Sequence, residues 1–194
     1  MNLPSYDRNN RYKAFEQLPK GAYVIKIVSA KEDTWPSGDQ CLRIAFDIAE
    51  GEYAGFYQKM FDNNHDEDKK WPFDAQYTLN VPNDGSEEYK WLQWNSFFAD
   101  LEDSNNGFVF KGDLKTLKGK VIGGLFRIKQ TQKDGKVYNH TELRWTKIAD
   151  DVRAGTFGRL PEDKLIAGAS IPAEQADSDG FMKIPEGAGE EFPF

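Results

Sequence analysis

Basic and aromatic side chains recur together along the chain, and their types and spacing suit one kind of chemistry. Single-stranded nucleic acid is bound without base reading when cations follow the phosphates and flat rings stack on the bases. The candidates come from connectors, strand-like runs and a hairpin: Lys31, Trp35, Arg43, Tyr57, Lys59, Arg127, Lys129, Lys133, Lys136 and Tyr138. We therefore expect these residues to form a surface that binds single-stranded DNA.

The distribution of charge supports this expectation better than the total does. The net charge of the whole chain is −7, which by itself argues against a nucleic-acid partner. Residues 107–159, however, hold twelve Lys or Arg and only five Asp or Glu, whereas residues 1–106 and 160–194 are acidic. A local basic stripe is the electrostatic footprint of nucleic-acid binding.

Alternating apolar residues predict the strands that would position these side chains. The runs that read as strands cover residues 21–31, 40–49, 55–61, 120–132 and 137–148. In the second run, Leu42, Ile44 and Phe46 fall on one face, which is the period of a half-buried strand. Asp134-Gly135 separates the last two runs, and this dipeptide between alternating segments is a strong hairpin signal.

One helix is predicted between the third and fourth runs. It would begin at Ser86, whose hydroxyl can cap it, and carry Trp94 and Phe98 on an apolar face. The order is then strand, strand, strand, helix, strand, strand, which is the order of an OB-fold barrel of five strands. We expect a mainly β protein with this barrel over residues 1–152 and a flexible acidic tail over residues 153–194.

In OB-folds, oligonucleotides cross the second and third strands between two loops, and the candidate residues fall at these places. Two aromatic candidates also fit a structural role. Trp35 could hold its connector in place, and Tyr57 could face the core, because the register of its short run is ambiguous.

The C-terminal tip combines acids with aromatic anchors. Its residues are Glu190, Glu191, Phe192, Pro193 and Phe194. A terminal Phe can fill an apolar pocket while its carboxylate pairs with Arg or Lys, and proline reduces the cost of ordering. We expect the tip to bind partner proteins.

Two parts of the chain resemble known families. The tip is similar to the acidic ending of bacterial single-stranded DNA-binding proteins, with Phe192 where Ile or Leu is usual. Residues 18–27 (LPKGAYVIKI) and 46–55 (FDIAEGEYAG) resemble a family of small tailed-phage proteins found among replication and recombination genes. This resemblance implies an OB-fold that coats and protects single-stranded DNA in the cytoplasm of a bacterial host. It also implies that the tip recruits replication and recombination proteins.

An enzyme is not expected. Neither His65 nor His140 lies in a local motif for nucleophilic catalysis, and the chain lacks a P-loop and a dinucleotide fingerprint. We expect no catalytic residue, metal ion or cofactor. Two alternatives stay open: a metal-dependent nuclease built from scattered carboxylates, and an OB-fold protein-interaction module that binds no nucleic acid.

Other features of the sequence concern disulfide bonds, membrane association and oligomeric state. One cysteine, Cys41, excludes an internal disulfide. No apolar run approaches the roughly 18–20 residues of a membrane helix, so a cytoplasmic protein without a membrane partner is expected. A homo-oligomer is an open alternative, because the Gly123-Gly124 pair would permit close packing.

Overall fold

Strands make up most of the regular structure. The structure is a computed structural model and describes residue 5 and residues 17–166. Its elements are β1 (Ala22–Thr34), β2 (Gln40–Ile48), α1 (Phe56–Asn63), η1 (Phe73–Ala75), β3 (Gln76–Asn80), α2 (Glu88–Asp103), η2 (Leu114–Leu117), β4 (Val121–Lys133), β5 (Lys136–Lys147) and α3 (Ala149–Ala154). None of the helices within these ranges is long and apolar enough to cross a membrane.

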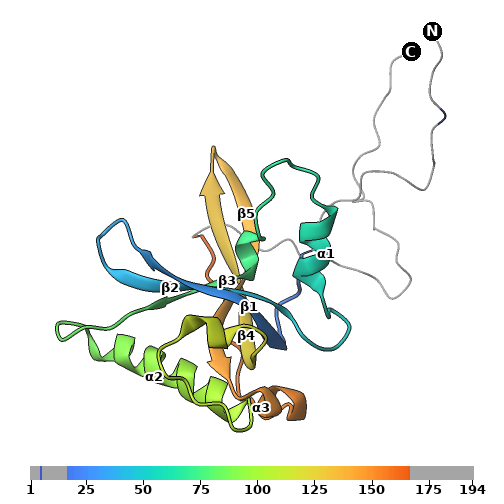
Figure 1. The fold of residues 1–194 in the computed structure, drawn as a ribbon. Coiled ribbons are helices and arrows are strands. Elements are labelled where there is room, and N and C mark those ends of the chain that lie inside the picture. Colours follow the sequence, from blue (N-terminus) through green and yellow to red (C-terminus); the bar gives the residue numbers. More distant parts are fainter. Residues whose placement is uncertain (1–4, 6–16, 167–194) are drawn as a thin grey trace, which may run out of the picture.

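The five strands form one antiparallel sheet in the order β3-β2-β1-β4-β5. Two long hairpins, β1–β2 and β4–β5, cross each other, and α2 runs beneath them (Figure 1). Within residues 17–166 no ladder joins β3 to β5, so the sheet is open at these two edges. The fold is mainly β as predicted, but the five strands form an open sheet instead of the predicted barrel.

The third strand lies elsewhere than predicted. Residues 55–61 do not form a strand: Gly55, with φ of 72°, leads directly into α1. The buried carboxylate of Asp47 on β2 accepts the backbone N–H of Tyr57 at 2.9 Å, a donor that a helix start otherwise leaves without a partner. The third strand is Gln76–Asn80, in a stretch for which no strand was predicted.

The remaining elements follow their patterns. Leu42, Ile44 and Phe46 are buried, as the alternation of β2 predicts. The predicted helix exists but begins at Glu88, and it buries Phe97, Phe98 and Leu101 against the sheet. The β4–β5 turn holds Asp134 and Gly135 at φ of 52° and 75°, which confirms the hairpin predicted from this dipeptide.

The chain stays in contact with the sheet beyond the expected start of the tail. The boundary expected at 152/153 lies inside α3. Farther on, Lys164 pairs with β4, since its N–H donates to the carbonyl of Ile128 and its carbonyl accepts from the N–H of Gln130, both at 2.9 Å. Asp163 also forms an ion pair with Lys20 at 2.9 Å. Residues 167–194, with the tip, lie outside the described residues.

Candidate nucleic-acid interface

A groove lies between β3 and β5, the two free edges of the sheet. One wall comes from β2 and β3 and the other from β4 and β5, while Trp35, Phe73 and Asp74 come from the connecting segments. We call this feature the edge groove. Its lining holds four Lys or Arg side chains, which are Arg43, Arg127, Lys129 and Arg144, and two acids, Asp74 and Glu142.

Strand register explains the wall formed by β2 and β3. Arg43 lies opposite Thr78, and alternation places Gln76 and Asn80 on the same face of β3 as Thr78. All four line the edge groove. On β1, Lys31 lies opposite Arg43 and is exposed, so it extends this face outward.

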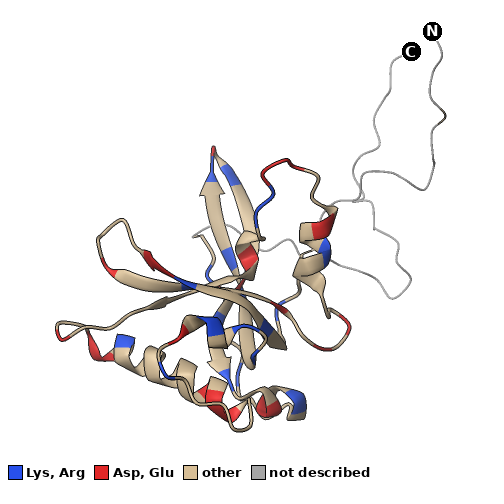
Figure 2. Ribbon diagram, viewed as in Figure 1, with Lys and Arg blue, Asp and Glu red and all other residues tan. Residues whose placement is uncertain are grey.

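The wall formed by β4 and β5 is the more basic one. The pairs that share the groove-facing side are Arg127 with Glu142, Lys129 with His140, Thr131 with Tyr138, and Lys133 with Lys136. The first two pairs and Thr131 line the groove, and the others continue the same face to the exposed tip of the hairpin. Lys and Arg lie along both strands of this hairpin (Figure 2).

Carboxylates hold several of these cations in place. Glu142 contacts Arg127 at 2.5 Å and Lys129 at 2.7 Å. Burial acts to raise the pKa of Glu142, but the hydrogen bonds from Lys129 and Arg127 outweigh it, and the pKa is lowered. Arg43 is paired in the same way with Asp33. These ion pairs therefore fix the positions of the cations before a ligand binds, and they also neutralise part of the positive charge.

Three side chains in the lining of the groove form a hydrogen-bonded chain. Asp74 contacts Nδ1 of His140 at 3.0 Å, and Nε2 of His140 contacts the hydroxyl of Thr131 at 2.9 Å. Burial raises the pKa of Asp74. This order of contacts is that of a nucleophilic triad with threonine at its end, and it also fixes the imidazole ring. Within residues 17–166 no group of three or more His, Cys, Asp or Glu is placed to hold a metal ion.

Two aromatic rings flank the cations. Phe73 is 72% exposed, and its ring contacts His140 edge-on with 6.1 Å between the ring centroids. Trp35 is half-buried: its indole N–H donates to Oδ1 of Asn80 at 2.8 Å, and the guanidinium of Arg43 lies 5.9 Å from its ring centroid. Trp35 thus holds its connector in place and also lines the groove.

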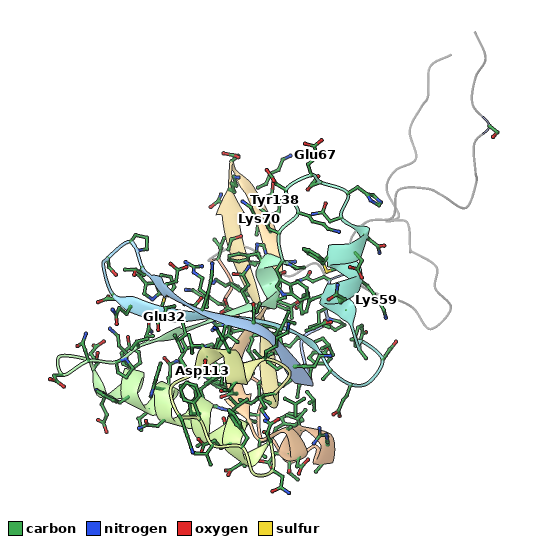
Figure 3. All side chains as sticks on the ribbon, viewed as in Figure 1. Glu32, Lys59, Glu67, Lys70, Asp113 and Tyr138 are labelled. Carbon is green, nitrogen blue, oxygen red and sulfur yellow. The ribbon has the colours of Figure 1, made fainter. Side chains whose placement is uncertain are left out.

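Most of the predicted site residues fall on this surface. The edge groove brings together Trp35, Arg43, Arg127 and Lys129. By register, the extended face adds Lys31, Lys133, Lys136 and Tyr138. Figure 3 shows Tyr138 near the tip of the hairpin.

Two predicted site residues lie elsewhere. Tyr57 is 1% exposed and packs in the core, because it lies on the inner face of α1 and not on a strand. Lys59 is on the outer side of α1, where its ammonium donates to the carbonyl of Ala54 at 3.2 Å (Figure 3). Neither lines the edge groove.

The N-terminal part of the chain matches a known protein family. Residues 5–83 match the model of a family described as "Protein of unknown function (DUF669)". The matched region contains β1, β2, α1 and β3, and therefore one wall of the edge groove. No curated protein matches the chain.

A substitution at Glu142 tests the electrostatics of the groove. Because the folded state lowers the pKa of Glu142, the charged carboxylate stabilises the fold above its ordinary pKa of 4.5, and this stability is lost as pH falls through the lowered pKa. Glu142→Gln is expected to reduce the free energy of unfolding at pH 7 by about 1 kcal/mol. The difference from wild type should disappear in strong acid.

Thermal unfolding followed by circular dichroism from pH 7 to pH 3 measures this difference. Glu32→Gln is the matched control, because Glu32 is exposed and forms no ion pair with any residue in 17–166. A deficit in Glu142→Gln that persists at the lowest pH would show that charge is not its cause.

Proposed function

We propose that this protein binds single-stranded DNA in the edge groove and coats and protects it during phage replication or recombination. The observation that supports this most is the convergence of Arg43, Arg127, Lys129 and Arg144, from three strands, beside the rings of Trp35 and Phe73. Cations that track the phosphates and rings that stack on bases are what sequence-independent binding requires.

We infer that the open sheet has the topology of an OB-fold and that its two free edges carry the binding groove. The strand order, and the position of α2 between β3 and β4, are those of this fold. OB-folds bind oligonucleotides across strands two and three, near the loops that join strands one to two and four to five. Trp35 lies in the first of these connectors, and Lys133 and Lys136 flank the second.

A duplex is the less suitable ligand. Recognition of double-stranded DNA commonly places a basic helix in the major groove. The longest described helix, α2, carries Lys90 as its only cation. Rings such as Phe73 can stack only on bases that are not already stacked within a duplex.

The wild-type protein provides the test of this proposal. Fluorescence anisotropy of labelled oligo-dT is measured at several salt concentrations, with duplex DNA as competitor. We expect salt-dependent binding that duplex does not displace, with log K falling by about 0.7 per phosphate contact for each unit of log salt. An absence of binding at low salt would overturn the proposal in favour of a protein-interaction module. Loss of the oligonucleotide with magnesium would instead indicate a nuclease.

The lysines at the hairpin tip give a second measurable effect. Lys133→Ala combined with Lys136→Ala removes two exposed cations that face the same way as the groove wall. We expect weaker binding and a salt slope shallower by about 1.4, from two contacts at about 0.7 each. Lys115→Ala with Lys118→Ala is the matched control, because these exposed lysines at η2 carry the same charge outside the groove. Equal slopes for the two double variants would exclude the hairpin from the binding path.

We further propose that the tip, residues 190–194, recruits replication and recombination proteins. The support is the sequence of the tip, whose residues lie outside the described part of the chain. A pull-down from host lysate with the full chain and with residues 187–194 deleted tests this role. Capture of the same proteins by both would contradict it.

A further inference from the structure

A second hollow opens between α2, the end of β5 and the segment after α3. Its cations are Arg144, Lys147 and Arg159, and two of its aromatic residues are Trp145 and Phe157. We call it the helix hollow. Like the edge groove, it is lined by both basic and aromatic side chains.

Negative charge is scarce in the helix hollow. Asp100 is its only acidic lining residue, and its carboxylate accepts a hydrogen bond from the hydroxyl of Thr146 at 2.8 Å. Burial raises the pKa of this carboxyl group. With three cations against one acid, the hollow favours an anionic ligand, and Trp145, at 37% exposed, leaves part of its ring for contact with a flat group.

The two hollows are adjacent and share part of their lining. Tyr77, Gln93 and Arg144 line both the edge groove and the helix hollow. The register of β4 and β5 shifts here, because Leu125 pairs with Trp145 whereas Phe126 pairs with Leu143. Arg144 is therefore the extra residue of a β-bulge, a feature that redirects side chains locally. It lies where a ligand would pass from one hollow to the other.

We propose that the single strand continues past Tyr77 and Arg144 into the helix hollow. There Trp145 stacks on a base, and Lys147 and Arg159 contact phosphates. This inference rests on the proposed function, and it makes the binding site longer than the edge groove alone. The shared walls favour a continuous strand over a separate small ligand, because a strand that fills one hollow is already at the mouth of the other.

The experiment is a length series. Oligo-dT of about 4 to about 24 nucleotides spans the roughly 4–16 nucleotides that one OB-fold covers. Each length is titrated against wild type, Trp145→Ala and Arg159→Ala. We expect the shortest oligonucleotides that bind to be unaffected by either change. For the longest, Trp145→Ala should weaken binding by about 5- to 150-fold, and Arg159→Ala should lower the salt slope by about 0.7.

Controls separate binding from folding. Trp145→Phe keeps a ring and should retain most of the affinity for long strands, while melting temperatures show whether Trp145→Ala is folded. Tyr89→Ala and Lys90→Ala remove an aromatic ring and a cation from α2 outside both hollows, and should change nothing.

The outcomes distinguish a failure of the extended path from a failure of the proposed function. Wild-type affinity for long strands in Trp145→Ala and Arg159→Ala, or an equal loss at every length, would overturn the extended path while leaving the edge groove intact. Free dTMP is a further competitor of oligo-dT. If it competes with wild type but not with Trp145→Ala or Arg159→Ala, the helix hollow binds a free nucleotide and not the continuing strand. Failure of wild type to bind any length would instead remove the proposed function itself.

Discussion

Phe73→Ala is expected to weaken the binding of oligo-dT by about 5- to 150-fold, the equivalent of about 1–3 kcal/mol for one stacked base. The ring is 72% exposed, and His140 is its one aromatic contact among the described residues. Little of it therefore contributes to the fold, and the melting temperature should stay close to that of wild type. Anisotropy titration and thermal unfolding of the same preparation measure both quantities.

Phe73 is a cleaner probe of stacking than Trp35. Truncation of Trp35 also removes the hydrogen bond to Asn80 and the contact with Arg43, so a loss of affinity could reflect a displaced connector. Phe73→Trp should restore binding, since it keeps a flat ring. Tyr89→Ala, which removes a 51% exposed ring from α2, is the control. Wild-type affinity in Phe73→Ala would rule out stacking at this position.

Gly123→Ala is expected to destabilise the fold by about 1–3 kcal/mol, because it overpacks a site that cannot expand. A Cβ at this position would lie 2.6 Å from Cγ2 of Val152, and 2.8 Å and 3.0 Å from the carbonyl oxygens of Lys147 and Ile148. Two of these atoms belong to the backbone and cannot move aside like a side chain. Gly123 thus allows α3 and the end of β5 to pack closely on β4.

Thermal unfolding measures this effect, with an expected fall in melting temperature of about 2–12 °C. Gly85→Ala is the matched control, because its nearest neighbour would be Oδ1 of Asn83 at 3.5 Å and its stability should stay within about 0.5 kcal/mol of wild type. A Gly123→Ala variant as stable as Gly85→Ala would show that α3 and the end of β5 do not pack this closely on β4. The close approach that this glycine permits is within one chain.

The sequence predicts those elements whose residues interact mainly with their neighbours along the chain. The buried apolar face of β2 and the Asp134-Gly135 turn are of this kind, and both are confirmed. The run at 55–61 is too short to distinguish the helical from the strand period. The contact that favours its helix comes from Asp47 on another element. The pairing of Lys164 with β4 depends on backbone atoms that leave no signal in residue type.

The residues of the candidate site were predictable from the sequence where a local pattern placed them. The cations of β4 and β5 follow from alternation and charge, so Arg127 and Lys129 could be placed from sequence alone. Phe73 could not, because it lies in an acidic segment and gains its position only from η1. His140 carries no local motif, and its partner Asp74 is 66 residues away in the chain.

Photo-crosslinking identifies the residues that lie against a bound single strand. Oligo-dT substituted with 5-iodouracil is irradiated with the full-length protein, and the crosslinked peptides are identified by mass spectrometry. We expect crosslinks at Phe73 and Trp35 in the edge groove and at Tyr138 on the face that extends it, and we expect salt and unlabelled oligo-dT to reduce all three. Crosslinks confined to the exposed rings of α2, such as Tyr89 and Trp91, would show that the strand binds there and would exclude the edge groove as its site.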